Sequence, residues 1–357
     1  MAHMAAALLC LTLTPVTPMT TARSGHTATR LRDGRVLIAG GMVRNRAFLN
    51  TAELYDPATH RFMPAGRMTS ARVGHAAALL PDGRVLLAGG WDTYLSTTAS
   101  AEVYDPRTNR FTALPNGMSA HRARASLTKL KDGRLLLAGG AESDHAPLRL
   151  VELFDPKSMT FRVTGALSEA RMAHTATLLR DGRVLIAGGR DDHDRVLASC
   201  EVYDPQRGIF VAAGSLVNAR YKHMAALLPD GRVLVAGGSD ARDWQGQFAS
   251  AEIYDPVANC STAAPPMLAA RFKLPDDAVV LPNGVLIAGG ADFAEVFANG
   301  RFTRVPGSFG GPWHYMSATP LANGDVLLAG GYANTSEATP QAWVATALSG
   351  TSDRARR

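Results

Sequence analysis

A nine-residue sequence motif recurs along this chain and constrains its fold more than any other feature. It reads DGRVLIAGG from Asp33, and six related copies begin at Asp82, Asp132, Asp181, Asp230, Asn283 and Asn323. The double glycines that end the copies are separated by 49, 50, 49, 49, 52 and 41 residues. A period near fifty residues predicts a repeat protein of seven equivalent units. It overrides the two or three domains that a length of 357 residues would suggest.

A full repeat carries signals for four β-strands. Asp-Gly between two apolar runs predicts a tight hairpin with a type I′ turn. The second run is apolar nearly throughout, which predicts a strand buried on both faces. After a variable loop a third strand ends in Asp-Pro, a turn-initiating pair, as in AELYDP from Ala52. An aromatic residue such as Phe62 then marks a fourth strand. Four antiparallel strands per repeat are typical of one blade of a β-propeller.

The chain ends predict how the ring of blades closes. Residues 11–18 are similar to the fourth strand of other repeats, and the last repeat has only its first three strands. The N-terminal strand should therefore complete blade seven, which removes an exposed edge. We expect the propeller over residues 11–345, a leader over 1–10 and a flexible basic tail over 346–357. For the leader, an added expression scar and a truncated signal segment both stay open.

The repeat resembles the kelch motif. The resemblance rests on the double glycine, a spaced Glu-x-Tyr and a spaced aromatic, with Phe where the kelch pattern usually has Trp, and it covers about residues 14–345. It implies an all-β fold, a seven-bladed β-propeller of the kelch and galactose-oxidase central-domain type. The blades would be four-stranded and antiparallel, and the N-terminal strand would close the ring.

Composition excludes several classes of partner. The net charge is +6, from 37 basic and 31 acidic residues, and many arginines occupy equivalent repeat positions, so the charge rings the fold. Without a Lys/Arg run or a single basic patch, no nucleic-acid partner is expected. No segment approaches the roughly 18 apolar residues that span a bilayer, so no integral membrane segment is expected.

The cysteines indicate no zinc or redox motif, because Cys10, Cys200 and Cys260 form no CxxC pair. We expect a monomer. The compartment stays open: secreted or periplasmic if the apolar N-terminus is a remnant signal, and cytoplasmic otherwise.

An arginine precedes the first strand of six repeats, at Arg23, Arg72, Arg122, Arg171, Arg220 and Arg271, and Trp313 takes its place in the seventh. In four repeats a histidine follows three residues later. The loop that holds this arginine should lie near the central channel. We expect Arg72, Arg171 and Arg220 to contribute to binding there, since guanidinium groups hold anionic or sugar ligands bidentately. Alternatively, each Arg bonds carbonyls of the neighbouring blade and each His caps strand backbone.

Function on propellers often lies where the repeats differ. The variable loops cover residues 42–50, 91–99, 141–149, 190–198, 239–249 and 332–340. Trp91, Trp244 and Trp313, together with His314, are predicted binding residues, because aromatics beside polar groups suit sugar stacking or protein contact. Packing of each Trp against the adjacent blade is the alternative.

The DDHD stretch from Asp191 offers three candidate metal ligands, Asp191, His193 and Asp194. Adjacent residues on one loop rarely converge on an ion without partners from elsewhere in the chain, so a solvated loop is favoured. No metal site and no cofactor are expected.

These observations favour a noncatalytic recognition scaffold that binds a protein or carbohydrate partner through its long-loop face, with no catalytic residue. The alternative is a carbohydrate-active enzyme on a kelch propeller. The resemblance to galactose oxidase implies, for such an enzyme, a copper-radical site of two Tyr, two His and a Cys cross-linked to one Tyr. Cys200 and Cys260 do not stand where that Cys is expected. A sugar mutarotase would need only a few channel residues.

Overall fold

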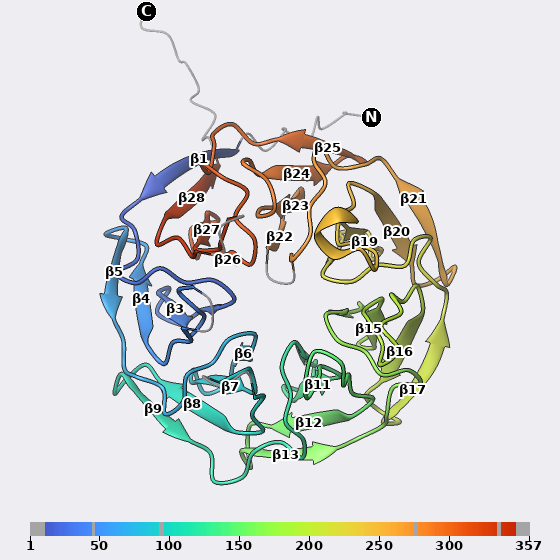
Figure 1. Cartoon of the computed structure of the whole chain (residues 1–357), viewed down its shortest axis with the longest axis horizontal. Coiled ribbons are helices and arrows are strands. Elements are labelled where there is room, and N and C mark those ends of the chain that lie inside the picture. Colours follow the sequence, from blue (N-terminus) through green and yellow to red (C-terminus); the bar gives the residue numbers. More distant parts are fainter. Residues whose placement is uncertain (1–10, 45–46, 93–95, 275–276, 334–336, 348–357) are drawn as a thin grey trace, which may run out of the picture.

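The computed structural model describes residues 11–44, 47–92, 96–274, 277–333 and 337–347. It contains seven four-stranded antiparallel sheets arranged as blades around a central channel (Figure 1). This confirms the predicted all-β, seven-bladed propeller. The predicted leader at 1–10 lies outside the described residues, as does the predicted tail over 346–357 except for residues 346–347, which belong to the strand Ala342–Ala347. Within the described ranges the only helix is a single 3-10 turn, η1 (Asp243–Gln245), and none could span a membrane.

Blades 1 to 6 follow chain order, each running from the channel outward. Blade 1 contains β2 (Thr27–Arg30), β3 (Val36–Ala39), β4 (Ala52–Asp56) and β5 (Arg61–Pro64); blade 2 contains β6 (Ala76–Leu79), β7 (Val85–Ala88), β8 (Ala101–Asp105) and β9 (Arg110–Ala113); blade 3 contains β10 (Ser126–Lys129), β11 (Leu135–Ala138), β12 (Val151–Asp155) and β13 (Thr160–Val163).

The second half of the ring repeats this order. Blade 4 contains β14 (Thr175–Leu178), β15 (Val184–Ala187), β16 (Cys200–Asp204) and β17 (Ile209–Ala213); blade 5 contains β18 (Met224–Leu227), β19 (Val233–Ala236), β20 (Ala251–Asp255) and β21 (Cys260–Ala264); blade 6 contains β22 (Ala278–Leu281), β23 (Gly284–Ile287), β24 (Glu295–Ala298) and β25 (Arg301–Arg304). Blade 7 contains β26 (Ser317–Pro320), β27 (Val326–Ala329) and β28 (Ala342–Ala347), and β1 (Leu11–Val16) is its outermost strand.

The Asp-Gly hairpins form as predicted but with a different turn. In blade 1 the Gly34 amide donates to the Leu31 carbonyl at 3.2 Å, and the Leu31 amide donates to the Arg35 carbonyl at 2.8 Å. Gly34 has φ +90°, whereas Asp33 is not among the residues with positive φ. The loop is therefore a three-residue turn that ends in a glycine bulge, not a type I′ turn. The Asp33 carboxylate stabilises it by accepting the Arg35 amide at 3.1 Å.

The second strand of each blade, which comes from the repeated motif, forms the core between neighbouring blades. β3, β7, β11, β15, β19, β23 and β27 are buried along their whole length. In five blades an aromatic of the third strand packs on an aromatic of the fourth, with ring centroids 4.8–4.9 Å apart. Because apolar side chains fill both faces of the second strand, neighbouring blades cannot separate without exposing core.

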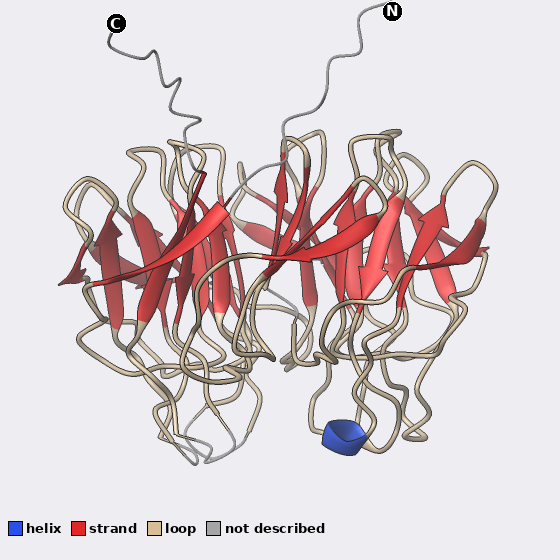
Figure 2. Ribbon diagram, turned by 90° about the horizontal axis from the view of Figure 1, so that it is seen from above, coloured by secondary structure: helices blue, strands red, loops and turns tan. Residues whose placement is uncertain are grey.

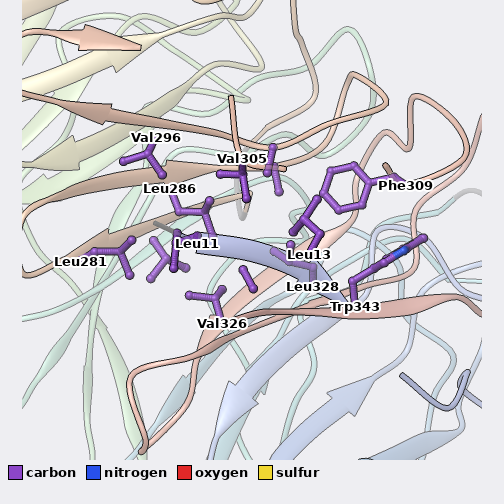
Figure 3. Close-up of a cluster of buried hydrophobic side chains, with 14 of the residues drawn as sticks. Leu11, Leu13, Leu281, Leu286, Val296, Val305, Phe309, Val326, Leu328 and Trp343 are labelled. Atoms are coloured by element: carbon purple, nitrogen blue, oxygen red, sulfur yellow. The ribbon is translucent and has the colours of Figure 1, made fainter. Parts of the chain in front are cut away.

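The N-terminal strand closes the ring, as predicted. β1 pairs antiparallel with β28 from Leu11↔Ala347 to Val16↔Ala342. Its inward side chains Leu11 and Leu13 enter a cluster that includes Leu286 of blade 6 and Trp343 of blade 7 (Figure 3). β1 therefore binds the two ends of the described chain into one blade and packs that blade against its neighbour.

The two faces of the disc differ. The loops that leave the second strands, together with η1, form the long-loop face, and the short hairpin turns form the opposite, tight-turn face (Figure 2). Backbone bonds join the blades near the long-loop face. The second glycine of each pair donates to the carbonyl at the repeated arginine position of the next blade, over 2.8–3.0 Å, in a complete ring from Gly41→Arg72 to Gly331→Arg23.

Candidate functional site

The repeated arginines lie in the interior and not at the channel mouth. Six Arg–Glu ion pairs form inside the blades at 2.7–2.9 Å, between Arg23 and Glu53, Arg72 and Glu102, Arg122 and Glu152, Arg171 and Glu201, Arg220 and Glu252, and Arg271 and Glu295. The Glu is the one in the third-strand Glu-x-Tyr/Phe sequence. Each guanidinium also donates to a carbonyl of its own blade, for example Arg72 Nη1 to Gly89 at 2.8 Å.

Arg72, Arg171 and Arg220 are 0% exposed, so no direct contact with a ligand is available to them in this structure. Their predicted part in binding stays a prediction, and the buried pairing favours a structural role. The carbonyl acceptors belong to the same blade and not to the neighbouring one, which corrects that detail of the alternative interpretation. The reason is that the third-strand Glu draws the guanidinium inward, because a buried cation requires a partner.

The four histidines connect neighbouring blades. Each Nε2 lies 2.9–3.1 Å from a hydroxyl on the first strand of the preceding blade: His26 with Ser317, His75 with Thr27, His174 with Ser126, and His223 with Thr175. These bonds join side chains across the blade boundary, and the rings of His26, His174 and His223 also interact with backbone, at Arg23, Arg171 and Ala187. Burial lowers the pKa of His26, His75 and His174 to about 3, and also lowers that of His223.

A second backbone ring surrounds the channel mouth, two residues after the repeated arginine position. Seven residues with φ between +52° and +63° form this collar: Gly25, Gly74, Arg124, Ala173, Lys222, Lys273 and Tyr315. Most amides donate to the carbonyl of the preceding collar residue, as in Gly74→Gly25 at 3.1 Å and Gly25→Tyr315 at 3.2 Å. In blade 6 the donor shifts by one residue, from Leu274 to the Lys222 carbonyl at 3.2 Å.

The collar position requires left-handed backbone, which glycine adopts without strain. Two blades use glycine there, whereas five carry a side chain. A side chain in this conformation costs about 1 kcal/mol. Strain of this kind is often found where the side chain serves function. Four of the five side chains are large and polar, namely Arg124, Lys222, Lys273 and Tyr315.

These side chains contact one another and the long loops. Lys222 Nζ donates to the Asp243 carboxylate at 2.7 Å, and burial lowers the Lys222 pKa to about 8. Lys273 Nζ donates to the Tyr332 hydroxyl at 2.5 Å. It also lies 4.5 Å from the ring centroid of Phe272, which favours a cation there.

Arg124, on the collar of blade 3, bonds Asp144 at 3.1 Å and covers the Trp91 ring at 4.5 Å.

The collar opens onto a cavity of about 600 Å³ inside the channel. Six of the seven collar residues line it, with small side chains of the first strands such as Ala76 and Ser126 below them. A cavity of this volume is large enough for a small organic ligand. The cavity extends past the collar toward the long-loop face, because Trp91 and Asp144 of the long loops line it as well.

The predicted aromatic site residues differ in their exposure to solvent. Trp244, on η1 in the longest loop, is 66% exposed. Trp91 is 7% exposed because its ring lies against Gly74 and beneath Arg124. His314 is also 7% exposed and packs its ring on Phe272 and Tyr332, at 4.8 and 5.7 Å. Burial lowers the His314 pKa to about 4.

Trp313 occupies the position that is arginine in the other blades. The position of the glutamate that pairs with this arginine has changed as well. In blade 7 the third-strand Glu position is occupied by Trp343, which is buried. The Trp313 indole donates to the Phe309 carbonyl at 2.9 Å, while the Phe309 ring packs edge-on against Trp343 at 5.1 Å. Blade 7 thus replaces the ion pair with an apolar cluster, which accounts for Trp313 by packing.

The candidate metal ligands do not gather. Among the described residues, no group of three or more His, Cys, Asp or Glu side chains could hold a metal ion. Asp191 instead caps its own loop by accepting the Arg195 guanidinium at 2.7 Å. The copper-radical donor set is not assembled by these residues either: Cys200 is buried in the third strand of blade 4, and Cys260 is exposed on the outermost strand of blade 5.

Sequence reasoning missed the collar. The signal lies two residues after the repeated arginine position, which is glycine in the first two repeats and a larger residue in the other five. A hydrophobic pattern does not reveal left-handed backbone, so it does not mark this position.

Comparisons with known proteins agree with this architecture. The Kelch motif family model matches residues 22–69, 72–118 and 220–268. No curated protein matches the sequence. A solved structure described as a novel fungal alcohol oxidase with catalytic diversity among the AA5 family, in complex with copper, is similar with a TM-score of 0.74 and 17% identity. The match covers 95% of this chain and 76% of that one, and it shows the fold alone. The chain is therefore a seven-bladed β-propeller that carries kelch repeats, three of which the family model matches.

Proposed function

We propose that this propeller is a noncatalytic recognition scaffold that binds a protein or carbohydrate partner over the channel mouth, on its long-loop face. The observation that carries the proposal is the collar. Arg124, Lys222, Lys273 and Tyr315 occupy strained backbone positions that glycine fills in blades 1 and 2. A scaffold role alone would be served more favourably by glycine.

The long loops add a second contact region. Trp244 presents a large, exposed aromatic ring at the tip of η1, and the Asp240–Arg242 ion pair lies beside it in the same loop. Exposed aromatics next to polar groups are frequent centres of protein and sugar recognition. Trp91 would act through Arg124, whose guanidinium covers its ring.

A screen of immobilised glycans and peptides tests the proposal. We expect at least one partner whose affinity falls about thirtyfold in Trp244→Ala, since loss of an aromatic anchor commonly costs about 2 kcal/mol. Val257→Ala is the matched control, because Val257 is 95% exposed on the tight-turn face. A partner that responds to Val257→Ala but to no long-loop or collar change would overturn the proposal.

A carbohydrate-active enzyme that uses the same mouth is the second candidate. Lys222 favours it, because a buried lysine with a pKa near 8 beside Tyr221 and Asp243 could transfer a proton. Incubation with reducing sugars, followed by NMR of the two anomers, tests it. Anomer exchange that exceeds the spontaneous rate and is lost in Lys222→Met would establish the enzyme and overturn the noncatalytic scaffold.

A further inference from the structure

The cations of the collar are not equally neutralised. Arg124 is paired with Asp144, and Lys222 with Asp243. Lys273 has no carboxylate within ion-pair distance among the residues that the structure describes. Its polar contact among those residues is the Tyr332 hydroxyl, at 2.5 Å. An ammonium group has three N–H donors, so two remain to bind an acceptor.

The two neighbouring pairs show which acceptor the collar accommodates. Asp144 and Asp243 belong to variable loops, and their side chains are 60% and 39% exposed. Their carboxylates reach the collar cations from the solvent side, at 3.1 and 2.7 Å. In blades 3 and 5 a carboxylate of the chain itself binds the collar cation. In blade 6 the equivalent position beside Lys273 could be filled by the carboxylate of a ligand.

Tyr332 provides a second donor at the same place. Its hydroxyl oxygen accepts the hydrogen bond from Lys273, so the hydroxyl hydrogen is available for another acceptor. The Tyr332 and Tyr315 rings lie 6.1 Å apart, and Lys273 is 5.1 and 5.9 Å from their centroids. An ammonium and a hydroxyl donor side by side match the two oxygens of one carboxylate.

We propose that the ligand of the channel mouth carries a carboxylate, which binds Lys273 with one oxygen and the Tyr332 hydroxyl with the other. The inference rests on the proposed function and names the ligand chemistry of that site. Arg124 and Lys222 are already paired with Asp144 and Asp243, so the open position for a carboxylate is at Lys273. A neutral ligand would leave the spare donors of Lys273 without an anionic partner.

D-glucuronate and D-glucose are suitable probes, since they share a ring and differ by one carboxylate. We expect calorimetry of the full chain at pH 7 and constant ionic strength to give at least tenfold tighter binding of D-glucuronate. Lys273→Gln should abolish the difference, and Tyr332→Phe should reduce it about fivefold. Lys157→Gln is the control, because that lysine is exposed on the tight-turn face, and it should leave the difference unchanged. Melting temperatures identify any variant that fails to fold.

Succinate and inorganic phosphate separate carboxylate recognition from general anion binding. Succinate binding that Lys273→Gln removes supports the proposal. Phosphate binding as tight as that of both carboxylates overturns the carboxylate assignment. The proposal also falls if neither carboxylate binds more tightly than D-glucose, or if Lys157→Gln and Lys273→Gln act equally.

The partner from the glycan and peptide screen separates this proposal from the proposed function. If that partner loses affinity in Trp244→Ala but not in Lys273→Gln, the recognition scaffold stands and the carboxylate site is wrong. If no long-loop or collar substitution changes its binding, both proposals are wrong.

Discussion

At the scale of single residues, buried charge supports each of six blades. Removing one member of a buried ion pair leaves the other without a partner, which typically costs 3–5 kcal/mol. We therefore expect Glu102→Gln to lower the free energy of unfolding by about 3 kcal/mol, measured by urea denaturation, because Arg72 is completely buried. Asp105→Asn is the control: its partner Arg107 is 79% exposed, and exposed ion pairs contribute little to stability. Equal losses would contradict the structural role of the pair.

The double glycines are a second residue-scale requirement. A Cβ on Gly89 would lie 2.3 Å from the Arg122 carbonyl oxygen, and its φ is +69°. Gly34 has a φ of +90° but nothing within 4 Å of such a Cβ. Both Gly89→Ala and Gly34→Ala should suffer backbone strain of about 1 kcal/mol, and only Gly89→Ala should add a clash. Thermal unfolding should give a clearly lower Tm for Gly89→Ala, and the reverse order would refute this explanation.

At the scale of elements, β1 decides whether blade 7 is complete. Without it β28 becomes an open edge, and Leu11 and Leu13 leave the cluster shared with blade 6. Deleting residues 1–16 should therefore lower Tm sharply and promote aggregation, whereas deleting residues 1–8, which removes none of the described chain, should have little effect. Calorimetry and light scattering of the two truncations would decide. Similar behaviour of both would exclude β1 as the closing strand.

At the scale of the whole molecule, the interblade histidines make stability depend on pH. Their pKa values fall from 6.5 in the unfolded chain to about 3 for His26, His75 and His174. The unfolded state therefore binds more protons, so stability is full above pH 6.5 and declines as pH falls toward 3. At pH 5 each of these histidines should cost about 2 kcal/mol relative to neutral pH.

Urea denaturation of wild type at pH 7 and pH 5 measures this loss. His75→Gln should be less stable at pH 7 but should lose less stability on acidification than wild type. An unchanged difference between the two pH values would show that His75 does not contribute.

The fold was largely predictable because the same sequence motif recurs in every blade. The motif that begins at Asp33 predicts a turn, a buried strand and a pair of glycines that end the strand. Seven copies at a period near fifty residues predict a propeller. The candidate site was much less predictable. Arg72 was visible as a repeated position, but the depth at which Glu102 holds it was not. Lys273 gave no signal because its hydrogen-bond partner Tyr332 lies 59 positions away, in the long loop of the next blade.

The β1–β28 pairing has a consequence for protein engineering. Leu11 and Ala347 are direct partners in the register, at the same edge of one sheet. A short hairpin linker could therefore join them, and new ends could be opened in a variable loop of another blade, since those loops lie at the surface. Such a circular permutant should fold with the same seven blades, because every interblade bond is retained and only the position of the chain break moves around the ring.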